Sequence, residues 1–126
     1  MYQRKLSFSE AVDRALKCNY FNFGGRASLS DFWWFLLFCM LSFVLGVFLG
    51  GVLGEAVACA IGVFVSVTLF VPMLSMAVRR LHDVNRSGWW LPFAITGIGL
   101  VPLLIWFCSS SHMDMNVYGD IPNMVD

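Results

Sequence analysis

The chain has few charged residues for its length. Asp, Glu, Lys and Arg make up only 13% of its 126 residues, whereas 59% are hydrophobic and 16% are aromatic. Water-soluble domains carry roughly a quarter charged residues, so this composition excludes an ordinary soluble domain built around one core. Between Phe32 and Val78, the single side chain that would be charged is Glu55. The sequence therefore predicts a membrane protein.

The four cysteines have no spacing that suits a metal site. Cys39, Cys59 and Cys108 lie in apolar segments, where a thiol behaves as a small apolar group. We therefore expect no disulfide, no bound metal and no cofactor. No cleavable signal peptide is visible, because the first apolar segment is too long for the apolar core of a signal peptide and lacks a small-residue cleavage site.

The apolar stretch of residues 32–78 is too long for a single membrane span. As one helix it would reach about 70 Å, at about 1.5 Å per residue, against a hydrocarbon core about 30 Å thick. It must fold back on itself, and the glycines and lone carboxylate of residues 50–55 indicate the break. This predicts two spans, at about residues 32–53 and 56–78.

A third apolar segment, residues 89–108, carries no charge and has tryptophans at both ends, as interfacial anchors do. We interpret it as a third span. It contains Pro92, Gly97, Gly99 and Pro102, so we expect it to be the least regular of the three. The alternative is a re-entrant segment that returns the tail to the cytoplasmic side.

The expected fold is thus an all-α membrane protein with three transmembrane helices. Residues 1–31 form a cytoplasmic N-terminal segment, residues 32–108 a single membrane domain, and residues 109–126 a polar tail. Within the first segment, residues 7–18 are predicted to form an amphipathic helix that begins with a capping box. That helix lies either in the head-group layer or against the protein's own loops.

The basic residues predict the orientation, since Lys and Arg are enriched in cytoplasmic loops. All of them lie before the first span or between the second and third: Arg4, Lys5, Arg14, Lys17, Arg26, Arg79, Arg80 and Arg86. The N-terminus and the second loop should therefore be cytoplasmic. The first loop and the C-terminal tail, which have no basic residue, should face the periplasm or the exterior.

Small residues recur every four positions along the first two spans. They are Ser42, Gly46, Gly50 and Gly54 in the first, and Ala58, Gly62 and Ser66 in the second. This spacing lets helices approach closely. We expect the two stripes to pack against each other within one chain, and a homodimer seam is the alternative.

Several short motifs resemble a known family. They are NFGGRAS at residues 22–28, DFWWF at 31–35, RRLHD at 79–83, RSGWW at 86–90 and NVYG at 116–119. Over roughly residues 20–123 the chain resembles the bacterial inner-membrane family called domain of unknown function 805. The resemblance implies a small multi-pass protein of the bacterial inner membrane, without an assigned reaction.

The chain departs from the pattern of that family at two places. The family usually has a basic residue and then Glu where this chain has Leu29, Ser30 and Asp31. It usually has an acidic residue directly before the proline, where this chain has Ile121.

One cytoplasmic cluster is chemically dense, and we take it as the candidate interface or ligand-binding site. Its residues are Arg26, Asp31, Arg79, Arg80, His82, Asp83, Arg86, Trp89 and Trp90. A structural interpretation pairs Arg79 with Asp83 and Arg26 with Asp31, and makes Ser87 or Asn85 a helix cap. The other interpretation is recognition of anionic lipid head groups, because guanidinium groups suit phosphate oxygens.

The function that these patterns favour is that of a binding or scaffold module whose basic and aromatic surface contacts anionic lipid or a membrane-protein partner. We expect no nucleic-acid partner. A homo-oligomeric small-solute transporter is an alternative. An enzyme acting on lipid phosphates is less favoured; there, His82 would be an acid or base oriented by Asp83.

Overall fold

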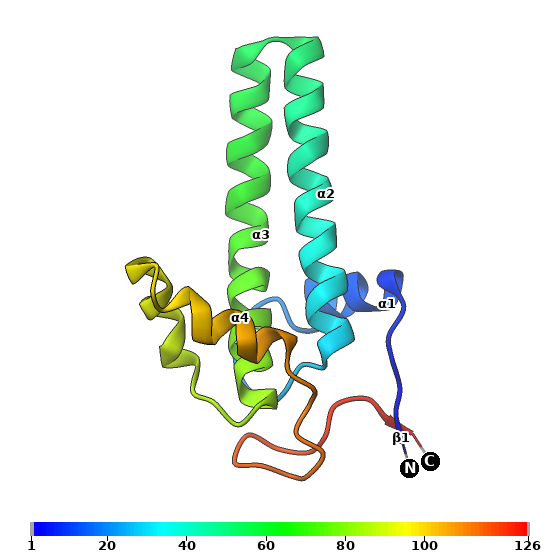
Figure 1. The fold of residues 1–126 in the computed structure, drawn as a ribbon. Helices are drawn as coiled ribbons and strands as arrows, with labels where there is room; N and C mark the ends of the chain where they lie inside the picture. The colour runs from blue at the N-terminus through cyan, green and yellow to red at the C-terminus, as the bar shows by residue number, and fades with distance from the viewer. Residues whose placement is uncertain (1, 126) are drawn as a thin grey trace.

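The computed structural model describes residues 2–125 and shows a long helical hairpin that rises from a smaller base (Figure 1). Helix α2 runs from Leu29 to Leu53, and helix α3 from Glu55 to Asp83. Between them stands Gly54, with a φ of +100°, in a region of backbone conformation that residues with a Cβ rarely adopt. The predicted break within residues 50–55 is confirmed.

Local sequence explains where helix α2 begins. The side chain of Ser28 accepts a hydrogen bond from the Asp31 N–H, and the Asp31 carboxylate accepts one from the Ser28 N–H. This capping box satisfies backbone donors that a helix leaves without partners in its first turn. The same arrangement of Ser7 and Glu10 begins helix α1, Phe8–Asp13.

The two long helices pack on each other through their small residues. A Cβ built on Gly50 would lie 2.1 Å from the Cβ of Ala58, so only glycine allows this approach. Gly46 faces Ile61 at an ordinary contact distance of 3.7 Å. The prediction that the two stripes pack within one chain is confirmed in part: Gly50 meets Ala58, whereas Gly62 of the second stripe faces open space.

The sides of the hairpin are apolar and exposed. Both helices are long and apolar enough to cross a membrane, and only 6% of the most apolar window of each is buried. A core helix of a soluble protein would instead be mostly buried. Phe48 and Phe64 are examples of large apolar side chains that the fold leaves uncovered.

The hydrophobic core lies at the foot of the hairpin. Here helix α1 and the π-helical turn η1, Arg14–Cys18, pack against helices α2 and α3. The buried members of this core are Ala15, Ala27, Phe32, Phe35, Met76 and Ala77. The predicted helical segment at residues 7–18 therefore exists, and it docks on the protein itself, with the Phe8 ring against Trp34.

The third predicted span, residues 89–108, is wrong as a continuous transmembrane helix. It forms a 3₁₀ helix, η2, Gly88–Thr96, and a separate helix α4, Leu100–Cys108. The rings of Trp90 and Trp106, which were expected at opposite membrane surfaces, lie 5.2 Å apart between centroids. Helix α4 crosses the foot of the hairpin instead of running beside it (Figure 1).

Proline and glycine account for this break. Pro92 has no N–H for an α-helical hydrogen bond, and the hydroxyl of Thr96 donates to the carbonyl of Phe93 at 2.7 Å. Gly97 then takes a φ of +72° and turns the chain. The segment thus folds back toward the base, which is the arrangement of the re-entrant alternative.

The predicted placement of the tail on the opposite side from the N-terminus is also wrong. Strand β2, Met124–Val125, pairs antiparallel with strand β1, Tyr2–Gln3, with Tyr2 opposite Val125. The two ends of the chain therefore lie together at the base (Figure 1). The sequence rule failed here because it counts only Lys and Arg, whereas the tail is held by backbone carbonyls that bind buried arginines.

Candidate functional site

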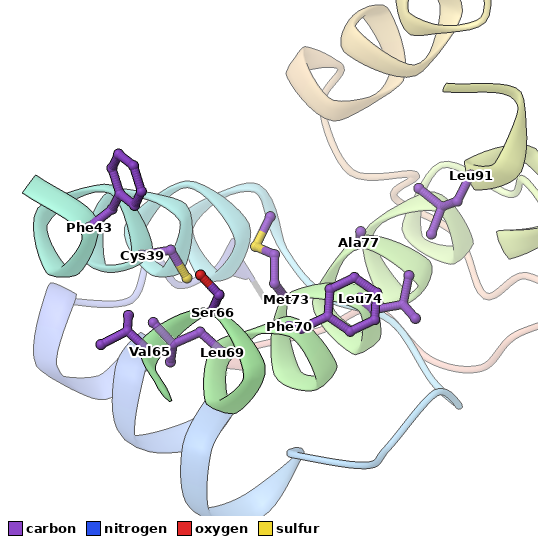
Figure 2. A pocket seen from close by; sticks show the side chains of 10 residues that line it. All are labelled: Cys39, Phe43, Val65, Ser66, Leu69, Phe70, Met73, Leu74, Ala77 and Leu91. Atoms are coloured by element: carbon purple, nitrogen blue, oxygen red, sulfur yellow. The ribbon is translucent and has the colours of Figure 1, made fainter. Parts of the chain in front are cut away.

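An apolar cleft of about 350 Å³ lies on the hairpin, between helices α2 and α3 and the start of η2. Figure 2 shows its side chains, among them Phe43, Leu69 and Leu91, with Cys39 and Ser66 as the polar members. This lining suits hydrocarbon. It offers no group for acid, base or nucleophilic chemistry beyond one thiol and one hydroxyl.

The polar centre of the molecule is a buried ionic cluster of Arg26, Arg80 and Asp83. One Asp83 oxygen lies 3.0 Å from the Arg26 Nη2, and the other pairs with the Arg80 Nη1. All three side chains are at most 1% exposed. Buried charges are tolerated only when they are paired and hydrogen-bonded, so these three groups depend on one another.

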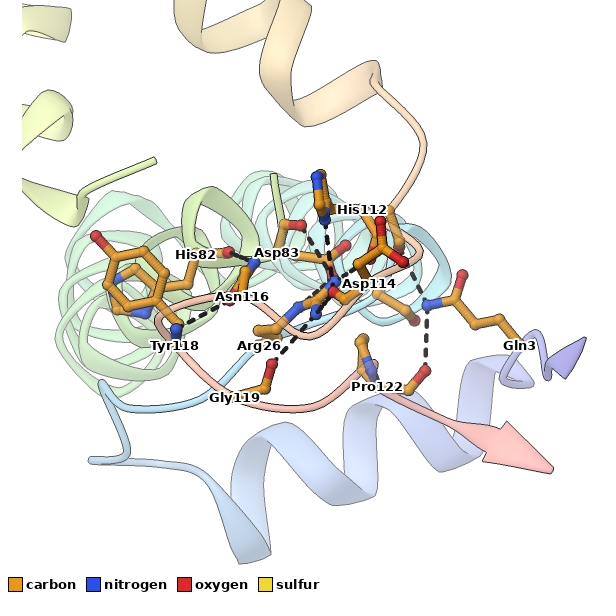
Figure 3. Close-up of polar contacts among 12 residues, drawn as sticks. Gln3, Arg26, His82, Asp83, His112, Asp114, Asn116, Tyr118, Gly119 and Pro122 are labelled. Carbon is orange, nitrogen blue, oxygen red and sulfur yellow. Dashed lines mark hydrogen bonds and ion pairs between the residues drawn. The ribbon is translucent and has the colours of Figure 1, made fainter. Parts of the chain in front are cut away.

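Arg26 also binds the C-terminal tail. Its Nη1 donates to the carbonyls of Asp114 at 2.9 Å and Gly119 at 3.3 Å, and its Nη2 donates to the carbonyl of His112. Figure 3 shows Arg26 at the centre of these contacts, with the tail wrapped around it. A planar guanidinium with five donors can satisfy several carbonyls at once.

Arg80 has the corresponding role for the end of helix α4. Its Nη2 donates to the carbonyls of Ser109 and, at 3.4 Å, Trp106. The His112 N–H in turn donates to the Asp83 carbonyl at 3.2 Å. The last turn of helix α3 thus holds both the end of helix α4 and the start of the tail.

Two predicted ion pairs are wrong. Asp83 pairs with Arg26 and Arg80 instead of Arg79, and Asp31 lies 3.6 Å from Arg14 instead of pairing with Arg26. Residues three and four apart on a helix can both pair, so local spacing did not distinguish Arg80 from Arg79. Arg26 and the tail carbonyls lie around Asp83 and Arg80, and these distant groups decide that Asp83 pairs with Arg80 instead of Arg79.

Arg79 is buried apart from this cluster. Its Nη2 lies 3.8 Å from the sulfur of Met76, and its Nε has no hydrogen-bond partner among residues 2–125. Its carbonyl accepts from the Ala27 N–H at 3.0 Å, which joins helix α3 to the segment before helix α2. The structure therefore places Arg79 in the interior of the base.

His82 is oriented by Gly25 and Tyr118, and Asp83 faces elsewhere. The His82 Nδ1 lies 3.1 Å from the Gly25 carbonyl, and the ring stacks on Tyr118 with centroids 3.8 Å apart and planes 3° from parallel. The Asn116 side chain donates to the His82 carbonyl at 2.8 Å (Figure 3). The geometry of the enzyme alternative, with Asp83 orienting His82, is not present.

The remaining predicted site residues lie on the rim of the base. Trp90 packs edge-on against Trp106, and the guanidinium of Arg86 lies 5.0 Å from the centre of the Trp106 ring. Trp89 is exposed. Ser87 caps η2, as predicted, because its hydroxyl oxygen accepts from the Trp89 N–H.

A larger groove, of about 800 Å³, runs between helix α3 and η2. We call it the α3/η2 groove. Its walls are mostly apolar and include Phe70, Leu74 and Trp89, while His82, Ser87 and Tyr118 supply its polar groups. Cavities of about 300–1,000 Å³ with an apolar lining and a few polar groups are typical of small-molecule sites.

Several contributors to the base were not predicted as site residues. Arg14 and Asn123 join Asp31 in a second polar cluster, in which the Asn123 amide donates to Asp31 at 3.0 Å. Asn116 and Tyr118 belong to the NVYG motif of residues 116–119, which closes on itself through a bridge between Asn116 and Gly119. That motif was the one feature of the sequence that could have indicated Asn116 and Tyr118 as site residues, because it matches the family pattern.

Lysine and arginine are confined to the base, but few of these side chains are both exposed and free of an ion pair. Arg4 pairs with Glu10 at 3.0 Å, and Lys17 pairs with Asp13. Within residues 2–125, Lys5 and Arg86 are exposed and have no acidic partner. In the same range, no group of three His, Cys, Asp or Glu side chains could hold a metal ion.

Comparison with known proteins gives one family. Residues 20–120 match the family described as "Protein of unknown function (DUF805)". The chain is 34% identical over 108 residues to the inner membrane protein YhaI of Escherichia coli (strain K12), covering 82% of this chain and 88% of YhaI. It is 34% identical over 111 residues to the inner membrane protein YhaH of the same strain, covering 84% and 91%. No solved structure matches the chain.

Proposed function

Since the chain belongs to the DUF805 family and is an integral inner-membrane protein, we propose that it is a two-span lipid-binding module whose base lies in the cytoplasmic head-group layer. The hairpin of helices α2 and α3 would cross the membrane and return, with Gly54 at the periplasmic end. Both chain ends and the loop before η2 would then be cytoplasmic.

The distribution of charge supports this orientation. All eight Lys and Arg residues belong to the base or to the last turns of helix α3, and the tip of the hairpin carries only Glu55. Cytoplasmic segments next to spans are enriched in basic residues. Helix α2 has 25 residues, which corresponds to about 37 Å and suffices for a hydrocarbon core about 30 Å thick.

The observation that carries the proposal is the position of the two exposed, unpaired cations. Lys5 lines a pocket together with Ser28, Ser30 and the serines of residues 110–111. Arg86 lines a second, more polar pocket, and the same two serines belong to its wall as well. Two cations therefore flank one serine segment at the end of helix α4, which suits the oxygens of a lipid phosphate.

The buried arginines support the same assignment by elimination. Arg26 and Arg80 are occupied by Asp83 and by backbone carbonyls, so their charge serves the interior of the base. Lys5 and Arg86 remain to meet an anionic surface, where each basic residue contributes about 1 kcal/mol. Lipid recognition is thus proposed for Arg86, at the rim of the predicted cluster, and for Lys5, which lies outside that cluster. The centre of the cluster stabilises the base.

Native mass spectrometry of protein released from nanodiscs tests the proposal. The nanodiscs contain equal amounts of phosphatidylglycerol and phosphatidylcholine. We expect the wild type to retain phosphatidylglycerol preferentially, and the Lys5→Gln/Arg86→Gln variant to lose that preference by roughly thirtyfold, given about 1 kcal/mol for each of the two cations.

Lys17→Gln is the matched control, because it removes a cation that Asp13 already neutralises. It should leave the preference unchanged. Equal retention of phosphatidylglycerol by the wild type and the double variant would contradict the proposal.

A further inference from the structure

The α3/η2 groove extends from the base along the hairpin. Its lining includes His82, Val78, Leu74 and Phe70, which follow one face of helix α3 over twelve residues. At about 1.5 Å per residue, this stretch is about 18 Å long. That is slightly more than one leaflet's share of a hydrocarbon core about 30 Å thick.

The groove continues into the cleft of Figure 2. Phe70, Leu74 and Leu91 belong to the walls of both cavities. Hydrocarbon lining therefore extends from the head-group level at His82 toward the middle of the hairpin. An acyl chain of a membrane lipid runs in the same direction and over a similar length.

The polar end of the groove offers both hydrogen-bond acceptors and donors. Because the Gly25 carbonyl can only accept, the His82 Nδ1 carries the hydrogen, and the Nε2 of the neutral ring has a free lone pair. The Tyr118 hydroxyl has no hydrogen-bond partner among the described residues, and Figure 3 shows it pointing away from Arg26. The Ser87 hydroxyl lies on the same wall.

The lining also excludes several ligand classes. No Asp, Glu, Lys or Arg belongs to the described wall of this groove. A phosphate would therefore lack a cation there, and an amphipathic peptide would lack partners for its charges. An uncharged head with a hydroxyl fits the polar groups present.

From these contacts we infer that the α3/η2 groove binds an uncharged glycerolipid with a free hydroxyl, of the diacylglycerol type. One acyl chain lies along helix α3 toward Phe70. The free hydroxyl donates to the His82 Nε2 and accepts from the Tyr118 hydroxyl. This site is separate from Lys5 and Arg86, so it goes beyond the proposed head-group site.

The test measures binding of dioleoylglycerol to the purified full chain in detergent by native mass spectrometry. The wild type should retain one molecule. Leu74→Trp fills the groove from helix α3 and should weaken retention at least tenfold. Val67→Trp places the same tryptophan on the same face of the helix, two turns toward the tip and outside the groove, and should leave retention unchanged.

Circular dichroism checks that each variant is folded. If Leu74→Trp fails to fold, Ile95→Trp fills the groove from η2, where the side chain is exposed and no core contact is lost. Undiminished binding by a folded groove-filling variant, or an equal loss in Val67→Trp, would overturn the inference.

The head group is tested with Tyr118→Phe, which keeps the stacked ring and removes only the hydroxyl. The wild type should prefer dioleoylglycerol over its methyl ether about fivefold, as expected for loss of one hydrogen bond. Tyr118→Phe should weaken retention of both ligands about fivefold and keep that preference, because it removes the donor to the ligand oxygen and leaves the His82 acceptor in place. No preference in the wild type, or displacement of dioleoylglycerol by phosphatidylglycerol at equal concentration, would refute the assigned head group.

The two proposed lipid sites can be tested separately. The Lys5→Gln/Arg86→Gln variant should bind dioleoylglycerol as the wild type does, while Leu74→Trp should keep its preference for phosphatidylglycerol. Loss of dioleoylglycerol binding in the Lys5→Gln/Arg86→Gln variant would contradict a separate groove site.

Discussion

Arg26 and Asp83 form an ion pair that joins residues 57 positions apart, and both side chains are almost fully buried. The Arg26 Nε and Nη2 both approach the same Asp83 oxygen, at 3.1 and 3.0 Å. The pair connects the segment before the first long helix with the end of the second. Because Arg26 also binds three tail carbonyls, it joins three parts of the chain at the foot of the hairpin.

Arg26→Ala should destabilise the protein strongly. The change leaves Asp83 with only Arg80 and removes the donors of three carbonyls, and loss of one partner from a buried pair costs about 3–5 kcal/mol. Arg26→Lys should rescue little, since one ammonium cannot replace the planar guanidinium. Thermal unfolding in detergent measures the effect. Lys17→Ala is the exposed comparison, and equal losses for Lys17 and Arg26 would argue against the buried cluster as the main connection.

The location of the tail can be tested by labelling single cysteines in a cysteine-free background. Met115 in the tail and Val52 near the tip are both exposed, at 73% and 67%. With a two-span topology, a membrane-impermeant maleimide applied to the periplasmic face should label Val52→Cys and not Met115→Cys. Inverted vesicles should give the opposite pattern. Labelling of both positions from the periplasm would contradict the two-span topology and support the three-span arrangement.

Gly50→Leu should separate the two long helices near the tip. Even a Cβ at position 50 would lie 2.1 Å from that of Ala58, and overpacking of this kind typically costs about 1–3 kcal/mol. Gly51→Leu is the control, because position 51 faces open space. Cross-linking in detergent should show the same oligomer for the wild type and for both variants. A change of oligomer specific to Gly50→Leu would instead support the homodimer seam.

The first capping box should respond to acid. Hydrogen bonds from the Ser7 N–H, together with Arg4, lower the pKa of Glu10 from 4.5 to about 2. Because the folded-state pKa is depressed, the contribution of Glu10 to stability is complete above pH about 4.5 and is lost as the pH falls toward 2. Unfolding temperatures over this range should fall less in Glu10→Gln than in the wild type. Parallel profiles for the two proteins would show that Glu10 does not carry this dependence.

Much of the hairpin could be predicted from residues close together in the sequence. The length of the apolar stretch and the glycines of residues 50–55 are both properties of neighbouring residues. From these features, three of the four ends of the two long helices were predicted to within three residues. The end of helix α3 was the exception, because it continues past Val78 through the buried residues Arg79 to Asp83.

The candidate site could be predicted only as a list of residues near one another. Arg26, Arg80, His82 and Asp83 do meet, but their partners could not be read from spacing. Asp83 had basic residues three and four positions away, and the choice depended on Arg26 and on tail carbonyls that arrive from distant parts of the chain. Every residue has a backbone carbonyl, so the sequence does not show which carbonyls bind the arginines.

Local hydrophobicity and backbone conformation are enough to predict that this chain is helical, enters the membrane and reverses within residues 50–55. The folding back of residues 89–108, the return of the tail to the N-terminus and the choice of cations left free at the surface depend on contacts between distant parts of the chain. The physical reason is that buried charges must find partners wherever the folded chain supplies them, and those partners lie up to 93 residues away from Arg26.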